Sequence, residues 1–510
     1  MILMFHLKKS ILLPRYTFLI LFILFFSSCN DNRNTAKPNF IFILVDDLGK
    51  EWISTYGAED IETPQIDQLA EKGIKFTKAY SMPQCTPSRV ALLTGQYPNI
   101  NGWINHYDVP RWGHGARFDP ERYPVFAKQM RDAGYRTCAA GKWQINDFRL
   151  EPEAMQNAGF EEYFMWTGGE GGNEEISDER YWDPYIHSKE GSKTYKDQFG
   201  PDLFSDFIIR FMEQNKDHPF LVYYPMVLTH TPFVHTPHEP DVVSKIDKHK
   251  AMVRYTDFIV GKIIDALERF DLRNKTYVIF TTDNGTTPAI AGLRNGSYII
   301  GGKTYLSENG INAPMIINHP GIIKEGRVSD ALIDFTDIFP TLSELGRVKN
   351  KQGSQNIQGK SFASLLRSQE KKRNKKWIMA MGSHPAMINE KDRVQSFFKF
   401  RDRAFRSDQF KVYVDTLSKM QRIFDLSSDP FETNNLVNTN TKIIDSIRNE
   451  IRSLLNKMPE QDHDPDYRKL DDSIWDISPS QLNKMSERAN RRTNKVGPLI
   501  SKEKYRELMH

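Results

Sequence analysis

Four short apolar runs recur along the chain, and each ends at a polar cluster. Their continuous apolar character predicts strands buried on both faces, at residues 39–45, 135–140, 219–228 and 276–282. Apolar residues at three- and four-residue spacing predict helices at 63–70, 124–133, 202–214 and 248–270. Strands that alternate with helices indicate an α/β fold with a mostly parallel central sheet flanked by helices.

The polar clusters fall at one edge of the predicted sheet. In such sheets, ligands bind beyond the carboxyl ends of the strands. The residues that reach this edge are Asp46, Asp47, Lys142, His230, Asp283 and Asn284. We therefore expect them to form one shared site.

Asp46 and Asp47 follow a buried strand, where adjacent carboxylates repel each other. A divalent cation offsets that repulsion, and Asp283 with Asn284 supplies a second pair of oxygen ligands. An all-oxygen set favours calcium or magnesium over zinc or copper. The alternative interpretation is that Asp46 or Asp47 only caps the next segment.

Cys85 stands before a predicted helix, in the segment Cys85-Thr-Pro-Ser-Arg89. Thr86 fits the N-cap position and Pro87 the first helical position. A thiol at a helix N-terminus, with Arg89 one turn on, is expected to have a lowered pKa or to hold an anion. A cysteine nucleophile is one interpretation of this pattern.

From about residue 377 the pattern changes to shorter segments. Residues 409–414 and 422–426 predict a small antiparallel sheet, with helices after it. We therefore expect three parts after the N-terminal segment: a catalytic domain at 38–376, a C-terminal subdomain at 377–458 and a polar, basic extension at 459–510.

The N-terminal segment has the pattern of a targeting signal. An apolar run at 16–26, short for a bilayer span, follows the basic residues Lys8, Lys9 and Arg15. The sequence Phe26-Ser-Ser-Cys29 resembles a bacterial lipoprotein cleavage site. Residues 1–28 are then a signal peptide, Cys29 carries the lipid, and 29–37 form a polar tether. A plain secretory signal and an uncleaved anchor are the alternatives, and all three place the body outside the cytoplasm.

Composition excludes several classes of protein. The 510 residues are 39% hydrophobic and 26% charged, which excludes a collagen, a coiled coil, a wholly disordered chain and a multi-span membrane protein. The net charge is +4, but without residues 1–28 the chain has 66 basic and 65 acidic residues. A basic field for nucleic acid is therefore not expected. With three cysteines, no disulfide framework is expected either.

The segment Cys85-Thr-Pro-Ser-Arg89, followed by Leu93-Thr-Gly95, resembles the signature of the formylglycine-dependent type I sulfatases, arylsulfatase-like members of the alkaline phosphatase superfamily. In that family the cysteine is oxidised to formylglycine, whose hydrate is the nucleophile. The resemblance spans about 38–436. The other matching segments are Asp46-Asp47, Gly141-Lys-Trp143, His230, Asp283-Asn-Gly285, Gly302-Lys303 and 424–436. It implies the alkaline-phosphatase-like α/β fold with a smaller C-terminal α+β subdomain.

The resemblance also implies a role for each matching residue. Calcium, favoured over magnesium, would be bound by Asp46, Asp47, Asp283, Asn284 and the modified Cys85. Arg89 would hold the formylglycine, and Lys142 and Lys303 would bind sulfate. His230 would donate a proton to the leaving oxygen. A formylglycine-generating maturation enzyme is an implied partner.

Some positions depart from the family pattern. Gln144 stands where the family commonly has His, so the base for sulfate expulsion is unassigned, with water or His106 as options. Asn309 and Asn312 replace a Gly and an Arg, which we expect to alter local packing. The loop residues considered as substrate contacts, against a plain surface role, are His235, His238, Arg111, Trp112 and His114.

Together these features predict an exported sulfatase that acts on sulfated polysaccharides or oligosaccharides of the algal or glycosaminoglycan type. It would lie in the periplasm or at the cell surface, lipid-anchored to the outer membrane. One alternative is a phosphoester hydrolase of the same superfamily, although those enzymes usually present Thr or Ser where this chain has Cys85. The other is a catalytically degenerate protein that binds sulfated glycans, which Gln144 motivates.

Overall fold

The computed structural model describes residues 36–104, 116–146, 148, 151–166, 180–348, 356–367, 375–382, 386–388, 394–396, 399–467 and 497–509. The chain divides into two units, Met1–Lys37 and Pro38–His510. The predicted signal peptide and Cys29 lie outside the described residues, as do His106, Arg111, Trp112 and His114. Within the described ranges, no helix has both the length and the apolar character needed to cross a bilayer.

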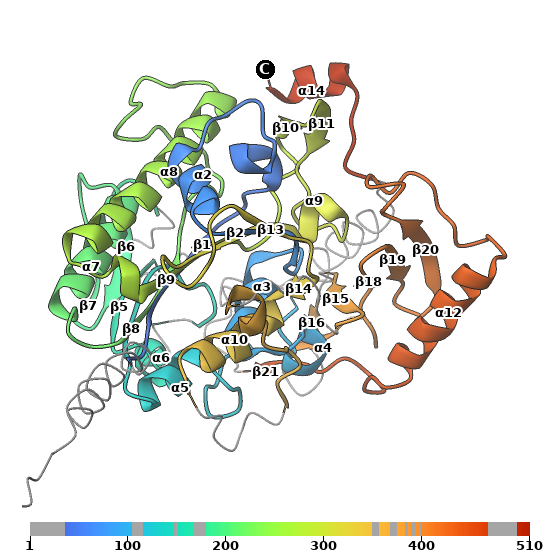
Figure 1. The fold of residues 1–510 in the computed structure, drawn as a ribbon, viewed down its shortest axis with the longest axis horizontal. Coiled ribbons are helices and arrows are strands. Elements are labelled where there is room, and N and C mark those ends of the chain that lie inside the picture. The colour runs from blue at the N-terminus through green and yellow to red at the C-terminus, as the bar shows by residue number, and fades with distance from the viewer. Residues whose placement is uncertain are drawn as a thin grey trace, which may run out of the picture. The chain divides into compact units, whose positions relative to one another are not determined.

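A mixed sheet forms the centre of the second unit (Figure 1). Its strand order is β13-β2-β12-β9-β1-β8-β4-β5-β6-β7, and β14 also pairs with β2. The five central strands run parallel, which confirms the predicted fold class: β9 (Thr276–Thr282), β1 (Asn39–Val45), β8 (Phe220–Pro225), β4 (Arg136–Lys142) and β5 (Glu162–Trp166). The outer strands are β12 (Asn312–Asn318), β2 (Ile74–Tyr80), β13 (Arg327–Ser329), β14 (Ile333–Asp334), β6 (Tyr185–Ser188) and β7 (Gly191–Thr194).

Alternate residues of β1 face two different hydrophobic cores. Phe40, Phe42 and Leu44 pack with the helices of one face, which include α3 (Cys85–Thr94), α5 (Phe126–Asp132) and α10 (Ile338–Leu345). Ile41, Ile43 and Val45 pack with α2 (Pro64–Glu71), α7 (Gly200–Gln214) and α8 (Lys245–Arg269) on the other face (Figure 1). The period of two residues along a strand therefore makes β1 apolar throughout.

The starts of two helices differ from the predicted ones. Helix α8 begins three residues before the predicted start, because the Ser244 side chain accepts a hydrogen bond from the Asp247 backbone N–H. Helix α3 begins at Cys85, with Gln84 at the N-cap position. The predicted Thr86 cap is therefore wrong. Thr86 lies inside the helix, and its hydroxyl donates to the carbonyl of Gln144.

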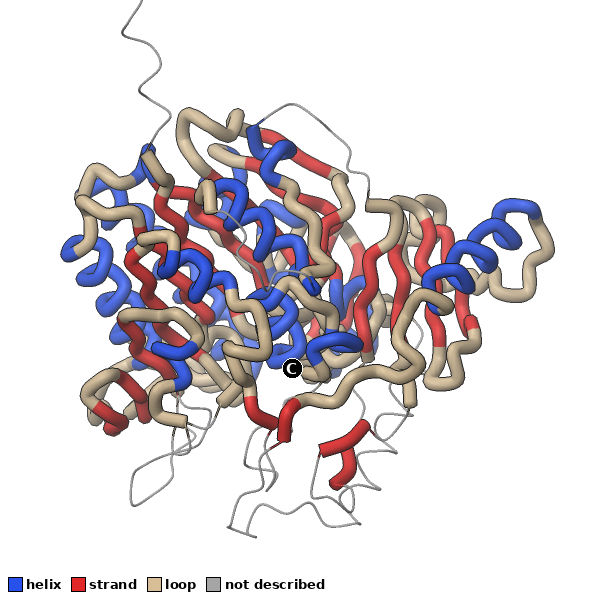
Figure 2. Tube along the Cα trace, turned by 90° about the horizontal axis from the view of Figure 1, so that it is seen from below, coloured by secondary structure: helices blue, strands red, loops and turns tan. Residues whose placement is uncertain are grey.

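The C-terminal subdomain contains the predicted antiparallel sheet, seen beside the main sheet in Figure 2. Its order is β15 (Ile378–Met381), β18 (Arg403–Arg406), β19 (Phe410–Val414) and β20 (Met420–Asp425). Helix α12 (Lys442–Leu455) buries its apolar stripe in this core through Ile444, Ile447 and Ile451.

The described ends of the C-terminal extension contact the catalytic part of the chain. Strand β21 (Asp466–Tyr467) pairs with β3 (Ala116–Arg117). Helix α14 (Lys502–Met509) places Tyr505 against Tyr298, with ring centroids 4.6 Å apart. Tyr298 belongs to the hairpin of β10 (Ala291–Arg294) and β11 (Ser297–Ile300). The shorter elements are α4 (Pro98–Asn101), α6 (Ala154–Asn157), α9 (Glu308–Ile311), α11 (Ala363–Arg367), β16 (Ala386–Ile388) and β17 (Val394–Ser396).

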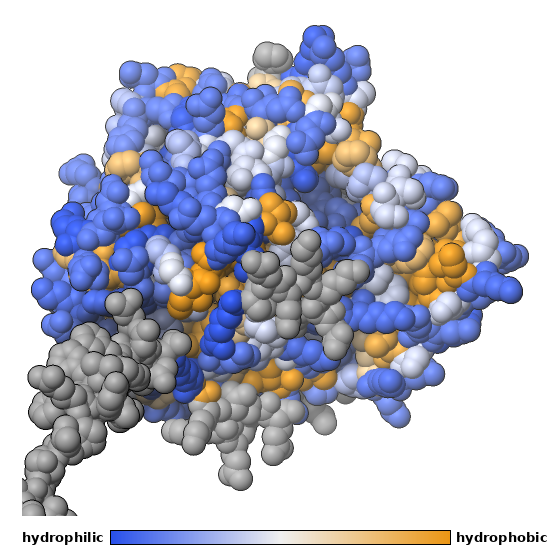
Figure 3. All heavy atoms as spheres, viewed as in Figure 1, coloured by the Kyte–Doolittle hydropathy of each residue, from blue (hydrophilic) through white to orange (hydrophobic). Residues whose placement is uncertain are grey.

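The face seen in Figure 3 is largely hydrophilic, with apolar groups between the polar ones. Among the described residues, the most exposed large apolar side chains come from separate elements: Val243 before α8, Val328 in β13, Leu417 between β19 and β20, and Ile443 in α12. Scattered apolar side chains of this kind are normal on a protein surface.

Candidate active site

The ends of β1 and β9 bring two oxygen-bearing pairs together. The two strands are parallel neighbours, with Val45 opposite Thr282. The residues that follow therefore lie side by side. The Asp47 backbone N–H donates to Asp283 Oδ1 at 3.1 Å, and Asn284 Nδ2 donates to Asp47 Oδ1 at 2.7 Å.

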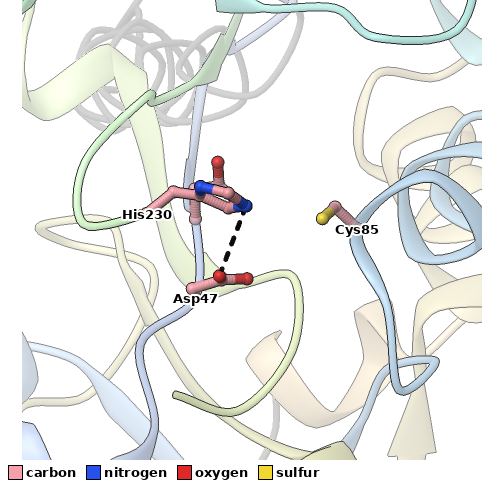
Figure 4. Close-up of side chains that lie close together, drawn as sticks. Asp47, Cys85 and His230 are labelled. Carbon is pink, nitrogen blue, oxygen red and sulfur yellow. Dashed lines mark ion pairs between the residues drawn. The ribbon is translucent and has the colours of Figure 1, made fainter. Parts of the chain in front are cut away.

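Cys85 approaches this edge from the first residue of α3. Its side chain points toward His230 and Asp47 in Figure 4. One ligand atom from each of Asp46, Asp47, Cys85 and His230 lies within 4.8 Å of the others. The structure thus brings Cys85, from the start of a helix, to the strand-edge residues Asp46, Asp47 and His230.

Arg89 lies one turn along α3 and is fully buried. Its Nε and Nη2 donate to Asp283 Oδ2 at 3.2 and 2.7 Å, and its Nη1 donates to the Lys142 carbonyl at 3.0 Å. These contacts fix Asp283 and the end of β4. The resemblance implies that Arg89 holds the formylglycine, whereas the hydrogen bonds observed here go to Asp283 and to the end of β4.

Two lysines each bind one carboxylate of the aspartate pair. Lys142 Nζ lies 2.7 Å from Asp46 Oδ2, and Lys303 Nζ lies 2.6 Å from Asp47 Oδ2. Gly141 has a φ of +117°, and a Cβ there would clash with the carbonyl oxygen of Pro225. Glycine at this position therefore lets Lys142 reach the site.

His230 presents one ring nitrogen to the site. Its Nδ1 lies 2.5 Å from the carbonyl oxygen of Thr231. Because a carbonyl only accepts, Nδ1 carries the hydrogen, and Nε2 faces Asp47 Oδ2 at 3.6 Å. Burial, and then the charge of Lys303, lower the pKa of His230 well below its usual value. The Tyr181 hydroxyl donates to the carbonyl of His230 at 2.5 Å and so holds this loop in place.

The donor set fits a hard divalent cation. Burial and the charge of Asp46 raise the pKa of Asp283. Burial opposes ionisation of Asp46 as well, but Lys142, His230 and Arg89 hold its pKa below its usual range. Among the described residues, Asp46 Oδ1 and Asn284 Oδ1 are buried with no hydrogen-bond partner. Unpaired buried oxygens beside repelling carboxylates are the arrangement that a bound cation stabilises.

The predicted lowering of the Cys85 pKa is wrong. Burial raises the pKa of the Cys85 thiol, although Lys142 and Lys303 act in the opposite direction. The side chain is only 4% exposed. The loss of hydration therefore raises the Cys85 pKa by more than the helix N-terminus lowers it. The unmodified side chain is a protonated thiol at neutral pH.

The structure also places the residues that depart from the family pattern. Gln144 has a φ of +52° and a buried Oε1 with no partner among the described residues. Asn309 Nδ2 donates to the Ile300 carbonyl, and Asn312 Oδ1 accepts from Lys50 Nζ at 2.6 Å. Asn312 thus holds the ammonium group of the buried Lys50.

Two histidines considered as substrate contacts lie against aromatic side chains. His235 stacks on Trp182, and His238 meets Tyr255 and Phe258. Sequence reasoning missed Tyr181, which supports the His230 loop, and Arg180, whose Nη1 lies 3.8 Å from Asp46 Oδ2. Neither belongs to a motif or to the end of a predicted strand.

The sulfatase family model matches residues 38–348, which include every residue of this site. The chain belongs to the sulfatase family. A second model, described as N-sulphoglucosamine sulphohydrolase, C-terminal, matches residues 296–461. The enzyme is therefore a sulfuric ester hydrolase, as the sequence predicted.

Named relatives agree with this assignment. The sulfatase is 24% identical to an ulvan-active sulfatase of Formosa agariphila over 465 residues, covering 84% of each chain. It is 31% identical to the N-acetylgalactosamine-6-sulfatase of Canis lupus familiaris over 329 residues, covering 60% of this chain and 61% of the relative. The crystal structure of Ps i-CgsB superimposes with a TM-score of 0.69 at 25% identity, covering 83% of this chain and 94% of that one.

Proposed function

We propose that this sulfatase hydrolyses sulfate esters of sulfated polysaccharides or their oligosaccharides, with formylglycine at position 85 and calcium as the metal. The observation that carries the proposal is the meeting of Cys85 with three buried carboxylates and two lysines at one sheet edge. The glycan class is supported by the ulvan-active relative and by a structural neighbour solved with a neocarrahexaose.

Asp46, Asp47, Asp283 and Asn284 would hold the cation. The unpaired Asp46 Oδ1 and Asn284 Oδ1 support this assignment, and oxygen donors favour calcium over softer metals. When bound, a divalent cation polarises the sulfate group and stabilises an ionised oxygen nucleophile.

The two lysines are placed to bind sulfate oxygens as point charges. Each is now paired with a carboxylate of the metal set, Lys142 with Asp46 and Lys303 with Asp47. A cation that neutralises these carboxylates leaves both ammonium groups for the substrate. His230 Nε2 is the ring atom that can carry a proton to the leaving oxygen, because Nδ1 is held by a carbonyl.

Modification of Cys85 supplies the nucleophile in this proposal. A buried thiol with a raised pKa is a weak nucleophile, which supports a different chemical form at this position. Formylglycine would supply a hydrated aldehyde. Attack of its oxygen on sulfur would break the bond to the ester oxygen, which would leave as the protonated alcohol. Arg89 keeps Asp283 oriented beside it.

Sulfate release from a panel of sulfated oligosaccharides tests the proposal. The protein is produced with a formylglycine-generating partner, and Cys85→Ala is the blank. We expect release above the blank from at least one algal or glycosaminoglycan fragment. Binding of the same glycans without release, by protein shown to carry the aldehyde, contradicts the proposal and favours a binding protein.

Export and lipid anchoring at Cys29 belong to the same proposal and rest on the sequence pattern alone. Labelling of the native protein with a radioactive fatty acid tests them, with Cys29→Ser as the control. We expect label in the wild type and none in the variant. An unlabelled wild-type protein released into the medium favours a plain secretory signal.

A further inference from the structure

Arg180 is held beside Lys142 by an aromatic stack. Its guanidinium carbon lies 3.8 Å from the ring centroid of Trp166, the last residue of β5. Trp166 pairs in register with Lys142, the last residue of β4. The stack therefore fixes the plane of the Arg180 fork at the same sheet edge as the nucleophile position. The Arg180 side chain is only 10% exposed.

Arg180 adds a positive charge that the described carboxylates of the site do not balance. Its Nη1 lies 3.8 Å from Asp46 Oδ2, an oxygen that already accepts a hydrogen bond from Lys142 at 2.7 Å. Within the described residues, the three carboxylates of the centre already contact three other cations, Arg89, Lys142 and Lys303. Arg180 is thus a fourth cation, and a bound metal ion would add to the excess.

Two nitrogens of the Arg180 guanidinium also lack a hydrogen-bond acceptor among the described residues. Nε and Nη1 of Arg180 are buried and have no hydrogen-bond partner in the described part of the chain. Leaving such donors unpaired is costly. A guanidinium fork matches the oxygens of an oxyanion, and a preformed stack reduces the entropy lost on binding one.

We propose that Arg180 is a further substrate-binding residue, which contacts an oxygen of the scissile sulfate group beside Lys142. This inference rests on the proposed function, because it takes sulfate as the ligand of the centre. It assigns to the sulfate a planar, charged donor in addition to the two lysines. Arg180 therefore contributes to sulfate affinity.

Titration of inorganic sulfate into the calcium-loaded full chain tests the inference by calorimetry. A Cys85→Ser background keeps the preparation uniform and catalytically silent. We expect Arg180→Gln to weaken sulfate binding by roughly 10- to 100-fold. The sulfate affinity of Arg180→Lys should lie between those of the background and Arg180→Gln, because lysine keeps the charge but loses the planar guanidinium fork. Arg422→Gln is the matched control, since Arg422 stacks on Tyr413 at 3.9 Å in the C-terminal sheet.

Calcium titration of the same variants separates this role from simple charge balance. If Arg180 only neutralises Asp46, Arg180→Gln changes calcium affinity and leaves sulfate affinity unchanged, which overturns the inference. Failure of the Cys85→Ser background to bind sulfate at millimolar concentration overturns it too. Turnover by the matured wild type tests the proposed function separately. Sulfate binding through Arg180 without any turnover would contradict the proposed function but not this inference.

Discussion

At the residue scale, the active site consists of buried charges that need one another. Arg89 and Asp283 are both fully buried and form a pair through two nitrogens of the arginine. Lys142 and Asp46 form a second buried pair. Removing one member of such a pair leaves an uncompensated charge, which typically costs about 3–5 kcal/mol. Substitutions here therefore affect folding as well as catalysis, and binding measurements must accompany activity measurements.

Calcium should stabilise the folded protein through the carboxylates. The pKa of Asp283 is raised by burial and by Asp46, so neutralising that repulsion favours the folded state. At a calcium concentration 100 times the dissociation constant, we expect a gain of about 2.7 kcal/mol, seen as a higher melting temperature. Asp283→Ala should abolish the gain and calcium-dependent activity. Asp206→Ala, a partly exposed acid paired with Lys262, is the control. An undiminished calcium response in Asp283→Ala would remove Asp283 from the metal set.

His249 predicts a loss of stability in acid. It is fully buried between Trp52 and Phe233, and burial lowers its pKa from 6.5 to about 3. On acidification, His249 is therefore protonated near pH 6.5 in the unfolded chain but only near pH 3 in the folded protein. Stability from this residue is complete above pH 6.5 and falls as the pH drops, by up to roughly 1.4 kcal/mol per pH unit. The free energy of unfolding, measured with urea at pH values from 7 to 4.5, should fall less steeply with decreasing pH in His249→Phe than in the wild type. An equal pH dependence in the two proteins contradicts the prediction.

At the element scale, the apolar runs predict four of the five central parallel strands and miss β5 and the outer strands of the main sheet, such as β2. The antiparallel strands β19 and β20 lie at the predicted segments 409–414 and 422–426. Strands β1 and β9 lie between two cores, so each is a continuous apolar run with a clear end. Strand β2 has the sequence Ile-Lys-Phe-Thr-Lys-Ala-Tyr, with polar residues on a half-buried face. Its pairing with β12 depends on residues more than 200 positions away, which local periodicity does not contain.

Helix α2 shows the same limit at its N-terminus. Thr63 occupies the N-cap position that the sequence predicts, but its side chain bonds Ser54 and Asp67. The backbone N–H groups of Gln65 and Ile66, which have no acceptor within the helix, donate to the Asp257 side chain of α8. A partner 191 residues away therefore caps the helix.

Asp257→Ala should destabilise the protein by about 1–2 kcal/mol, because two N–H groups at the start of α2 lose their acceptor. Asp257→Asn keeps an acceptor oxygen and should lose less. Urea unfolding at pH 7 measures both. Equal losses in the two variants would show that the charge of Asp257 matters and its hydrogen bonds do not.

At the scale of the whole molecule, a buried ion cluster joins the C-terminal sheet to the catalytic part of the chain. Lys411 of β19 lies 3.0 Å from Glu308 of α9 and 3.0 Å from Glu432. Glu308 follows Lys303 by five residues, so the cluster supports the segment that carries an active-site lysine. The carboxyl subdomain therefore supports the site, although none of its described residues belongs to it.

Lys411→Met should leave Glu432 without its lysine and Glu308 with only the longer contact to Arg406, at 3.7 Å. The expected cost is about 3–5 kcal/mol in urea unfolding, with a lower kcat because the Lys303 segment loses support. Lys419→Met, at an exposed position in the next turn, is the control and should behave as the wild type. A stable Lys411→Met protein with unchanged kcat would separate the subdomain from the active site.

Most of the site follows from the sequence because its residues directly end strands or begin a helix. Asp46, Lys142 and Asp283 are fixed by strand ends, Cys85 is marked by its place at the start of a helix, and family resemblance adds Lys303. Arg180 escapes prediction because a stack on Trp166, rather than a strand end, positions it. The thiol pKa of Cys85 escapes prediction for a different reason: burial depends on the complete fold, and local sequence shows only the helix and Arg89.

The most direct test of the central claim compares specific activity with the chemical form of residue 85. Preparations made with graded amounts of the maturation partner are assayed for sulfate release, and the peptide containing position 85 is quantified by mass spectrometry. The account predicts that activity is proportional to the aldehyde fraction and vanishes in fully unmodified protein. Sulfate release by protein that carries only the Cys85 thiol would contradict it.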